Sequence, residues 1–272
     1  MPFMTAYRIF RIERGDNAAS MKGTMNKENA STAAERRLVS TRSIPPRERL
    51  IFALDVSSTE EAKKMVEKLG DSVLFYKIGL QLFMAGGYFE LLEWLTARKK
   101  KVFADLKFYD VPQTVQLAVQ ALKGRNIEFV TIHGNDKIMK AAATNKNNLK
   151  ILAVTVLTSM DASDLRQMGY MGSVEDLVLS RAQQALELGC DGIIASGLEA
   201  ARIREQLGPK LIIVCPGIRP VATVDDQKRT VDVRQAFLSG ADYIVVGRPI
   251  KDAPDPREAA EGIQRTIAEV FG

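Results

Sequence analysis

Residues 105–110 read Asp-Leu-Lys-Phe-Tyr-Asp, so three charged side chains follow the apolar run Val102-Phe103-Ala104 within one short segment. Desolvating a carboxylate or an ammonium is costly unless each charge is paired, and the alternating signs of Asp105, Lys107 and Asp110 are those that mutual pairing requires. An opposite charge nearby favours the ionised form of each group. The cluster is therefore a candidate catalytic site.

Two glycine-arginine pairs form a second candidate site, one suited to an anion. Gly217 and Arg219 follow the apolar run 211–215, and Gly247 and Arg248 end the run that begins at Tyr243. Backbone N–H groups at such turns bind phosphate oxygens, and the guanidinium fork of arginine matches two of those oxygens. Each pair alone is a weak signal, but two pairs after consecutive strands predict phosphate binding.

The elements that must position these residues repeat along the chain from Leu50 onward. Short β-branched runs alternate with longer segments whose apolar residues recur every three or four positions. Ser58 and Thr59 mark one helix start, Pro256 marks another, and Gly189 marks a helix end. The pattern predicts an α/β fold, a single (β/α)8 TIM barrel domain over residues 46–272. Its eight strands are expected at 50–56, 74–78, 102–107, 129–133, 151–157, 192–196, 211–215 and 243–247.

A barrel of this kind places its chemistry at the C-terminal ends of the strands. Seven of the eight predicted strands end in polar or glycine-rich residues, among them Asp55, Lys77 and His133. Because side chains alternate along a strand, Asp105 and Lys107 should share the face that reaches the mouth. Asp110 lies beyond the strand, and two alternatives stay open: it folds back on the same site, or it projects toward a neighbouring subunit.

Two segments between elements are longer than the usual connections of a barrel. Residues 160–173 follow the fifth predicted strand and residues 220–229 follow the seventh. Their length favours lids over the mouth, with Gln227 placed to reach a bound phosphate. The alternative is that both are tolerated surface insertions.

Composition limits the classes of function and the extent of the folded domain. The net charge of +5 comes from residues 1–49, which hold ten Lys or Arg against five Asp or Glu, whereas the remainder holds 28 of each. Without a basic stripe interleaved with aromatic residues, the chain is not expected to bind nucleic acid. Residues 1–45 are polar and are expected to be a disordered extension or to precede the true start codon.

Cysteine, histidine and hydropathy exclude further classes. Cys190, Cys215 and His133 are the whole supply of thiol and imidazole, too few for a disulfide framework or a zinc site. Buried packing is the expected role of both thiols, and a reducing cytoplasm fits them. No run approaches 18 apolar residues, so no membrane span is expected.

Six short segments, read in order, narrow the function. They are Ala-Leu-Asp55, Tyr-Lys77-Ile-Gly, Asp105-Leu-Lys107-Phe-Tyr-Asp110-Val-Pro, Thr155-Val-Leu-Thr158-Ser159, Pro216-Gly-Ile-Arg219-Pro and Val246-Gly-Arg248-Pro. Together they resemble the orotidine 5'-phosphate decarboxylase family, from about Leu50 to the C-terminus. The Asp-x-Lys-x-x-Asp motif alone identifies only the wider group of phosphosugar barrels, and residues 1–45 have no counterpart.

The resemblance implies a cofactor-independent decarboxylase of the pyrimidine pathway. Lys107 would be the proton donor, with Asp105, Lys77 and Asp110 as charged neighbours. The implied substrate contacts are Asp55 to the ribose, Thr158 and Ser159 to the pyrimidine, and Arg219, Gln227, Gly247 and Arg248 to the 5'-phosphate or its lid. Asp110 and Thr114 would come from the partner chain of a homodimer.

Two other functions remain as alternatives. A 3-keto-gulonate-phosphate decarboxylase or hexulose-phosphate synthase resembles this chain in the Asp-x-Lys-x-x-Asp motif but uses a carboxylate-held magnesium. Such enzymes place an acidic ligand where this chain has Lys77, which argues against them. A non-catalytic phosphate-binding barrel is the other alternative. His133 is interpreted as a wall residue of the site, because a lone imidazole beside a glycine is more often hydrogen-bonded structure than a general base.

Overall fold

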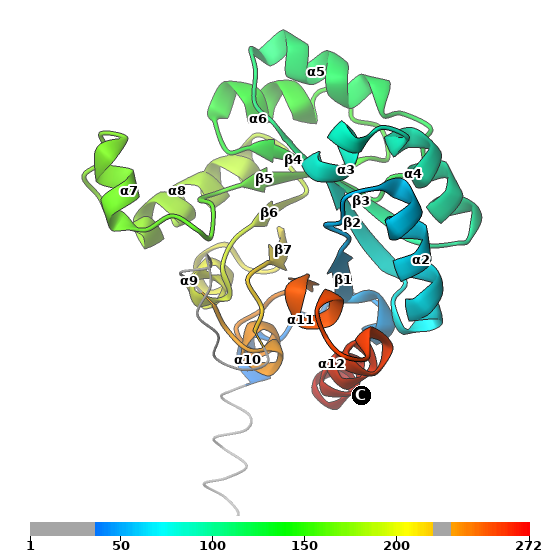
Figure 1. Ribbon diagram of the computed structural model, residues 1–272. Coiled ribbons are helices and arrows are strands. Elements are labelled where there is room, and N and C mark those ends of the chain that lie inside the picture. The colour runs from blue at the N-terminus through cyan, green and yellow to red at the C-terminus, as the bar shows by residue number, and fades with distance from the viewer. Residues whose placement is uncertain (1–35, 220–229) are drawn as a thin grey trace, which may run out of the picture. The chain divides into compact units, whose positions relative to one another are not determined.

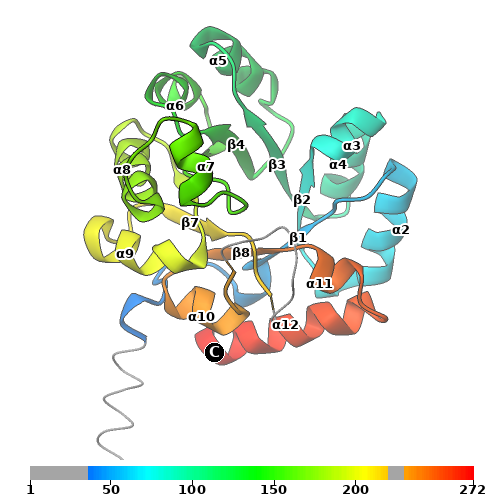
Figure 2. The same ribbon diagram turned by 60° about the vertical axis from the view of Figure 1, so that its left-hand side comes forward.

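The computed structural model describes residues 36–219 and 230–272. The chain divides into two units, Met1–Arg37 and Leu38–Gly272, and the barrel lies in the second. Helices surround the strands of this second unit in Figure 1, and the turned view of Figure 2 shows the same arrangement.

Eight strands form a closed barrel in the order of the sequence, and every strand pairs in parallel with its two neighbours. The barrel closes through β1 and β8, where Ile51 is the register partner of Val245. The predicted (β/α)8 fold is confirmed. The strands are β1 (Leu50–Ala53), β2 (Phe75–Gly79), β3 (Lys101–Phe108), β4 (Phe129–His133), β5 (Lys150–Val154), β6 (Gly192–Ile194), β7 (Ile212–Cys215) and β8 (Tyr243–Val246).

Helices follow the strands and cover the outside of the barrel. The hydroxyl of Ser58 accepts a hydrogen bond from the N–H of Glu61 at 3.1 Å, and Pro256 opens the last helix, as the sequence predicted. The α-helices are α2 (Thr59–Leu69), α3 (Leu80–Ala85), α4 (Tyr88–Ala97), α5 (Pro112–Ala121), α6 (Asp136–Ala143), α7 (Ala162–Gln167), α8 (Val174–Glu187), α9 (Gly197–Leu207), α10 (Val233–Leu238), α11 (Arg248–Lys251) and α12 (Pro256–Phe271). Short 3₁₀ turns are η1 (Arg36–Leu38), η2 (Pro46–Glu48) and η3 (Gly70–Ser72).

Several strands end earlier than the sequence predicted. The first, fifth, sixth and eighth end at Ala53, Val154, Ile194 and Val246, one to three positions before the predicted ends. The prediction was wrong there because backbone pairing in the barrel stops although most of the following residues are still buried, and Asp55, Val156, Leu157 and Gly247 among them line the mouth. The second and third strands end one position later than predicted, at Gly79 and Phe108.

Aromatic rings fill the barrel interior near the N-terminal ends of the strands. The ring centroids of Phe75 and Phe129 lie 5.2 Å apart, and Tyr243 lies 5.2 Å from Phe129. Phe103 stands edge-on to Phe129 at 5.9 Å. These buried rings close the barrel at the N-terminal ends of its strands, so a cavity can open only toward the C-terminal ends.

The segment before β1 belongs to the barrel unit. The buried carboxylate of Asp242 accepts a hydrogen bond from Ser40, lies 3.5 Å from Nε of Arg42 and pairs with Arg204 at 2.5 Å. The guanidinium of Arg49, 2% exposed, donates to the carbonyl of Asp242 at 3.1 Å. Residues 38–45, which precede the predicted boundary at residue 46, therefore contact the barrel through Asp242 and Arg49, and the second unit begins at Leu38.

Two smaller expectations concern the thiols and the membrane. Cys190 and Cys215 are buried and free, and burial raises the pKa of Cys190 to about 12, as expected for packing residues. Within the described ranges, none of the helices has the length and apolar character needed to cross a membrane.

Candidate functional site

A cavity of about 310 Å³ opens at the C-terminal ends of the strands. Its floor is apolar and comes from inward-facing strand residues such as Phe103 and Val154, which belong to the interior core. Its walls carry most of the residues selected from the sequence: Asp55, Lys77, Asp105, Lys107, Thr158, Ser159, Gly217, Arg219, Gly247 and Arg248. The closed barrel thus joins the ends of β1, β2, β3, β5, β7 and β8 at one site.

Four charged side chains form an alternating row along one wall. The ammonium of Lys77 lies 3.1 Å from Oδ1 of Asp55 and 3.2 Å from Oδ2 of Asp105. The ammonium of Lys107 lies 2.8 Å from Oδ1 of Asp105. Asp105 therefore bridges both lysines, one on each carboxylate oxygen.

Burial and charge pairing shift the pKa values of Lys77 and Asp105 in opposite directions. Burial alone would lower the pKa of Lys77, but the charges of Asp105 and Asp55 outweigh it and raise the pKa. Burial would likewise raise the pKa of Asp105, whereas Lys77, Lys107 and the Thr131 hydroxyl lower it to about 2. Both groups are therefore ionised at neutral pH, and so the row keeps its charges inside a largely buried wall.

The backbone at Lys107 is unusual for a strand residue. Lys107 has φ of +47°, in the left-handed region that costs a non-glycine residue about 1–2 kcal/mol. The pairing of β3 with β4 is irregular here. Ala104 pairs with Val130, and the next pair along the two strands is Phe108 with Ile132. Residues 105–107 of β3 therefore face a single residue of β4, Thr131.

The sequence analysis did not select Thr131. The available signal was its position two residues after Phe129, on the face of the strand that points into the barrel.

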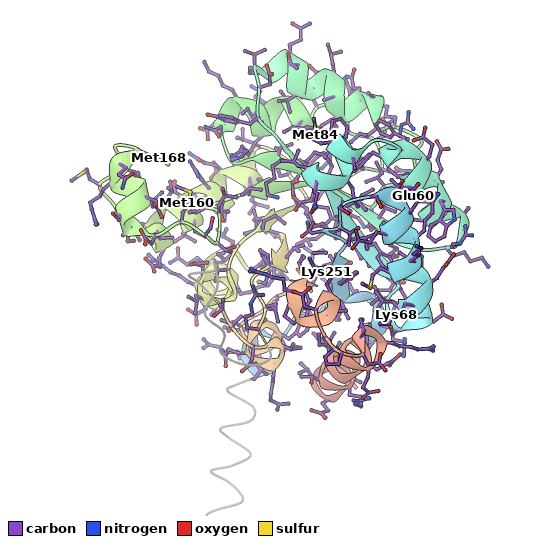
Figure 3. The ribbon with its side chains drawn as sticks, in the orientation of Figure 1. Glu60, Lys68, Met84, Met160, Met168 and Lys251 are labelled. Carbon is purple, nitrogen blue, oxygen red and sulfur yellow. The ribbon has the colours of Figure 1, made fainter. Side chains whose placement is uncertain are left out.

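Cations that follow β7 and β8 also line the cavity. Arg219 and Arg248 both line the cavity, and the N–H of Arg219 donates to the carbonyl of Val231 at 3.0 Å. Lys251, labelled in Figure 3, also lines it from the short helix α11 and donates to the carbonyl of Asp55 at 3.3 Å. The sequence reasoning did not select Lys251, although its position one helical turn after Arg248 places both on one side of α11.

Two predicted residues, Asp110 and Thr114, are not part of this cavity in a single chain. Asp110 is exposed and its carboxylate accepts a hydrogen bond from the N–H of Val111 at 2.6 Å, so it does not fold back on Lys107. Thr114 is exposed in the first turn of α5. Gln227, together with the predicted lid 220–229, lies outside the described residues.

His133 faces a neighbouring cavity. This second cavity has a volume of about 410 Å³ and is lined by His133, Tyr109, Tyr170 and Arg181, among others. The His133 ring lies 4.8 Å from the ring of Tyr109, and burial, with the charges of Arg181 and Lys107, lowers its pKa. A neutral imidazole packed on a tyrosine agrees with a wall residue.

The segment after β5 is partly helical. Residues 160–173, expected as a lid loop, contain α7. The helix starts with a capping box, in which Asp161 accepts from the N–H groups of Ser163 and Asp164 and Asp164 accepts from the N–H of Asp161. Met160 and Met168, labelled in Figure 3, lie in this segment and line the second cavity.

The described residues contain no group of three or more His, Cys, Asp or Glu side chains arranged to hold a metal ion. At the end of β2, the ammonium of Lys77 lies between two carboxylates. A second cation at this point would be repelled by the first.

Comparisons with known proteins agree on one family. Residues 48–263 match the model of the orotidine 5'-phosphate decarboxylase / HUMPS family. The chain is 58% identical over 235 residues to orotidine 5'-phosphate decarboxylase of Methylococcus capsulatus, covering 86% of this chain and 97% of the relative. It is 53% identical over 227 residues to the same enzyme of Stenotrophomonas maltophilia, covering 82% and 94%.

Solved structures give the same result for the fold. The crystal structure of orotidine 5'-phosphate decarboxylase from Lactobacillus acidophilus has a TM-score of 0.72 and 34% identity, covering 81% of this chain and 99% of that one. That of the Pyrococcus horikoshii enzyme has a TM-score of 0.65 and 27% identity, covering 80% and 99%.

Proposed function

Because this chain belongs to the orotidine 5'-phosphate decarboxylase / HUMPS family, we propose that it converts orotidine 5'-phosphate to uridine 5'-phosphate, the last step of de novo pyrimidine nucleotide synthesis. The observation that carries the proposal is the alternating row Asp55, Lys77, Asp105 and Lys107 in the wall of a cavity that Arg219, Arg248 and Lys251 also line. A substrate with a reacting ring at one end and a phosphate at the other fits the row and these cations together.

Lys107 has the central role in the proposed reaction. The bond between C6 and the carboxylate breaks, carbon dioxide leaves, and the electron pair stays on C6. This vinyl carbanion has little resonance stabilisation, so a fixed positive charge beside it lowers the barrier. The ammonium of Lys107, 2.8 Å from Asp105, then transfers a proton to C6 and regains one from water.

Asp105 and Lys77 support this step electrostatically. With a pKa of about 2, Asp105 is ionised when substrate binds, and it repels the substrate carboxylate. This repulsion disappears as carbon dioxide leaves, so it raises the ground state more than the transition state. Lys77 holds the second oxygen of Asp105 and directs the other toward Lys107.

Phosphate binding takes place away from the reacting carbon. Arg219 and Arg248, with the backbone at Gly217 and Gly247, are proposed to hold the 5'-phosphate, and Thr158 and Ser159 to contact the pyrimidine. Asp55 would contact the ribose, and Gln227 would reach the phosphate from the segment 220–229. Binding energy gained at the phosphate can then hold the ring against the charged row.

The proposed reaction needs no metal ion or organic cofactor, which separates it from that of magnesium-dependent members of the family. We expect purified protein to consume orotidine 5'-phosphate, followed by the change in absorbance, at the same rate with and without EDTA. A magnesium-dependent activity would stop in EDTA and resume on adding Mg²⁺. No turnover under either condition would contradict the proposed function.

We further propose a homodimer whose two sites are shared between the chains. Asp110 and Thr114 are exposed, and so are the large apolar side chains Tyr109, Val111 and Leu117 around the start of α5 and Leu80, Phe83 and Met84 of α3, the helix that follows the neighbouring strand β2. A second copy covering this surface would bring its own Asp110 toward the charged row. The proposed location is the cytoplasm, whose reducing conditions keep two buried thiols free.

Mixing two inactive variants tests the shared site. Lys107→Ala and Asp110→Ala should each be inactive alone, but a refolded or co-expressed mixture should recover activity. Random pairing makes half of the dimers mixed, and each mixed dimer has one intact site, so about a quarter of wild-type activity is expected. If Asp110 serves the site of its own chain, every site in the mixture lacks one group and no activity returns.

A further inference from the structure

Thr131 of β4 is fully buried and contacts the charged row through both functions of its hydroxyl. Its oxygen accepts the backbone N–H of Lys107 at 3.0 Å, and its O–H donates to Oδ1 of Asp105 at 2.8 Å. The same Oδ1 receives the ammonium of Lys107 at 2.8 Å. One hydroxyl thus joins the backbone of the lysine to the carboxylate that orients its side chain.

These bonds lie where the ladder between β3 and β4 is interrupted. Between the pairs Ala104 with Val130 and Phe108 with Ile132, no regular backbone pairing holds the intervening residues of β3. The N–H of Lys107 therefore uses a side chain as its acceptor in place of a strand carbonyl. An interrupted strand bends and re-aims its side chains, which is why such irregularities recur beside active sites.

We propose that Thr131 is a positioning residue that sets the direction of the Lys107 ammonium by fixing both its backbone, at φ of +47°, and its carboxylate partner Asp105. The inference rests on the proposed function for its effect on turnover, but its structural part does not depend on which reaction the site performs. Thr131 is absent from the cavity lining, so it acts through Lys107 and Asp105 and not on the substrate.

The experiment compares Thr131→Val, which keeps the shape and removes the hydroxyl, with Thr131→Ser, which keeps the hydroxyl. Thr155→Val is the matched control, because Thr155 is equally buried at the end of the neighbouring β5 and its hydroxyl donates at 2.8 Å only to the carbonyl of Ile194. All four proteins are assayed for kcat and KM with orotidine 5'-phosphate and for hydrogen exchange of the Lys107 amide.

Thr131→Val should lower kcat by ~10- to 100-fold with KM within about threefold of wild type, because a misplaced catalytic group affects the transition state more than binding. It should also expose the Lys107 amide to exchange, whereas Thr131→Ser and Thr155→Val should retain the wild-type values of both. A kcat for Thr131→Val within threefold of that for Thr155→Val would overturn the proposal, and so would a Ser variant as impaired as the Val variant. If wild type shows no turnover, the proposed function fails, and unchanged exchange at Lys107 in Thr131→Val then overturns the positioning role by itself.

Discussion

Replacing Lys107 by alanine is expected to lower kcat for orotidine 5'-phosphate by roughly 10⁴- to 10⁷-fold. Proton transfer by a positioned acid contributes about 10²–10⁴ and a preorganised charge beside the developing anion about 10²–10³, and Lys107 is proposed to supply both. The variant also leaves one oxygen of Asp105 without its lysine partner, while Lys77 stays on the other. Single-turnover assays at high enzyme concentration would measure the residual rate.

Lys101→Ala is the matched control for that experiment. Lys101 begins the same strand that carries Lys107 near its other end, and it is likewise paired with a carboxylate, at 2.5 Å from Glu48. Its loss should leave kcat within about twofold, since exposed or partly exposed pairs contribute little to the structure around them. A Lys107 variant that retains more than one tenth of wild-type kcat would rule out its role as the proton donor, and a barrel that only binds phosphate would show no decarboxylation to lose.

Replacing Arg248 by alanine should lower kcat/KM by ~10²-fold or more, about 2.7 kcal/mol of transition-state stabilisation. Arg248 lines the same cavity as the charged row, and a guanidinium forms forked hydrogen bonds to phosphate oxygens that alanine cannot replace. Because phosphate binding holds the ring in place, part of the loss should appear in kcat as well as in KM.

The control here is Arg257→Ala, an exposed arginine in the first turn of α12 that does not line the cavity. It should retain kcat/KM within about twofold. Free phosphate or phosphite added with a substrate that lacks the 5'-phosphate should stimulate wild type but not Arg248→Ala. A loss below threefold in steady-state assays would contradict the phosphate assignment.

The sequence contained most of the fold in local patterns. β-branched runs alternating with amphipathic segments predicted all eight strands, and the cap Ser58 and the first-turn proline Pro256 marked helix starts that the structure confirms. Strand ends were less predictable. Val56 and Val156 are buried in the hydrophobic cluster that includes the surrounding helices, although neither belongs to a strand.

The general rule that the chemistry of a barrel lies at the C-terminal ends of its strands also predicted which separate residues form one site. Because parallel strands of a closed barrel present their C-terminal ends at one face, Asp55, Lys77, Asp105 and Arg248 were expected to meet although they are far apart in the chain, and all line one cavity. Residue type and strand position were sufficient for that grouping. They were not sufficient for Asp110, whose position beyond the strand end depends on the path of a loop.

What the chain determined by itself is therefore its periodicity, its order of elements and the polar residues at the strand ends, since each depends on neighbours within a few positions. Tertiary structure alone decided which oxygen of Asp105 meets which lysine, the interruption of β3 that turns Lys107 and leaves its N–H to Thr131, and the attachment of residues 38–45 through Asp242. These contacts join residues from different strands and from opposite ends of the sequence. Their geometry is fixed only when the barrel closes, because closure sets the register between strands and brings the charges within pairing distance.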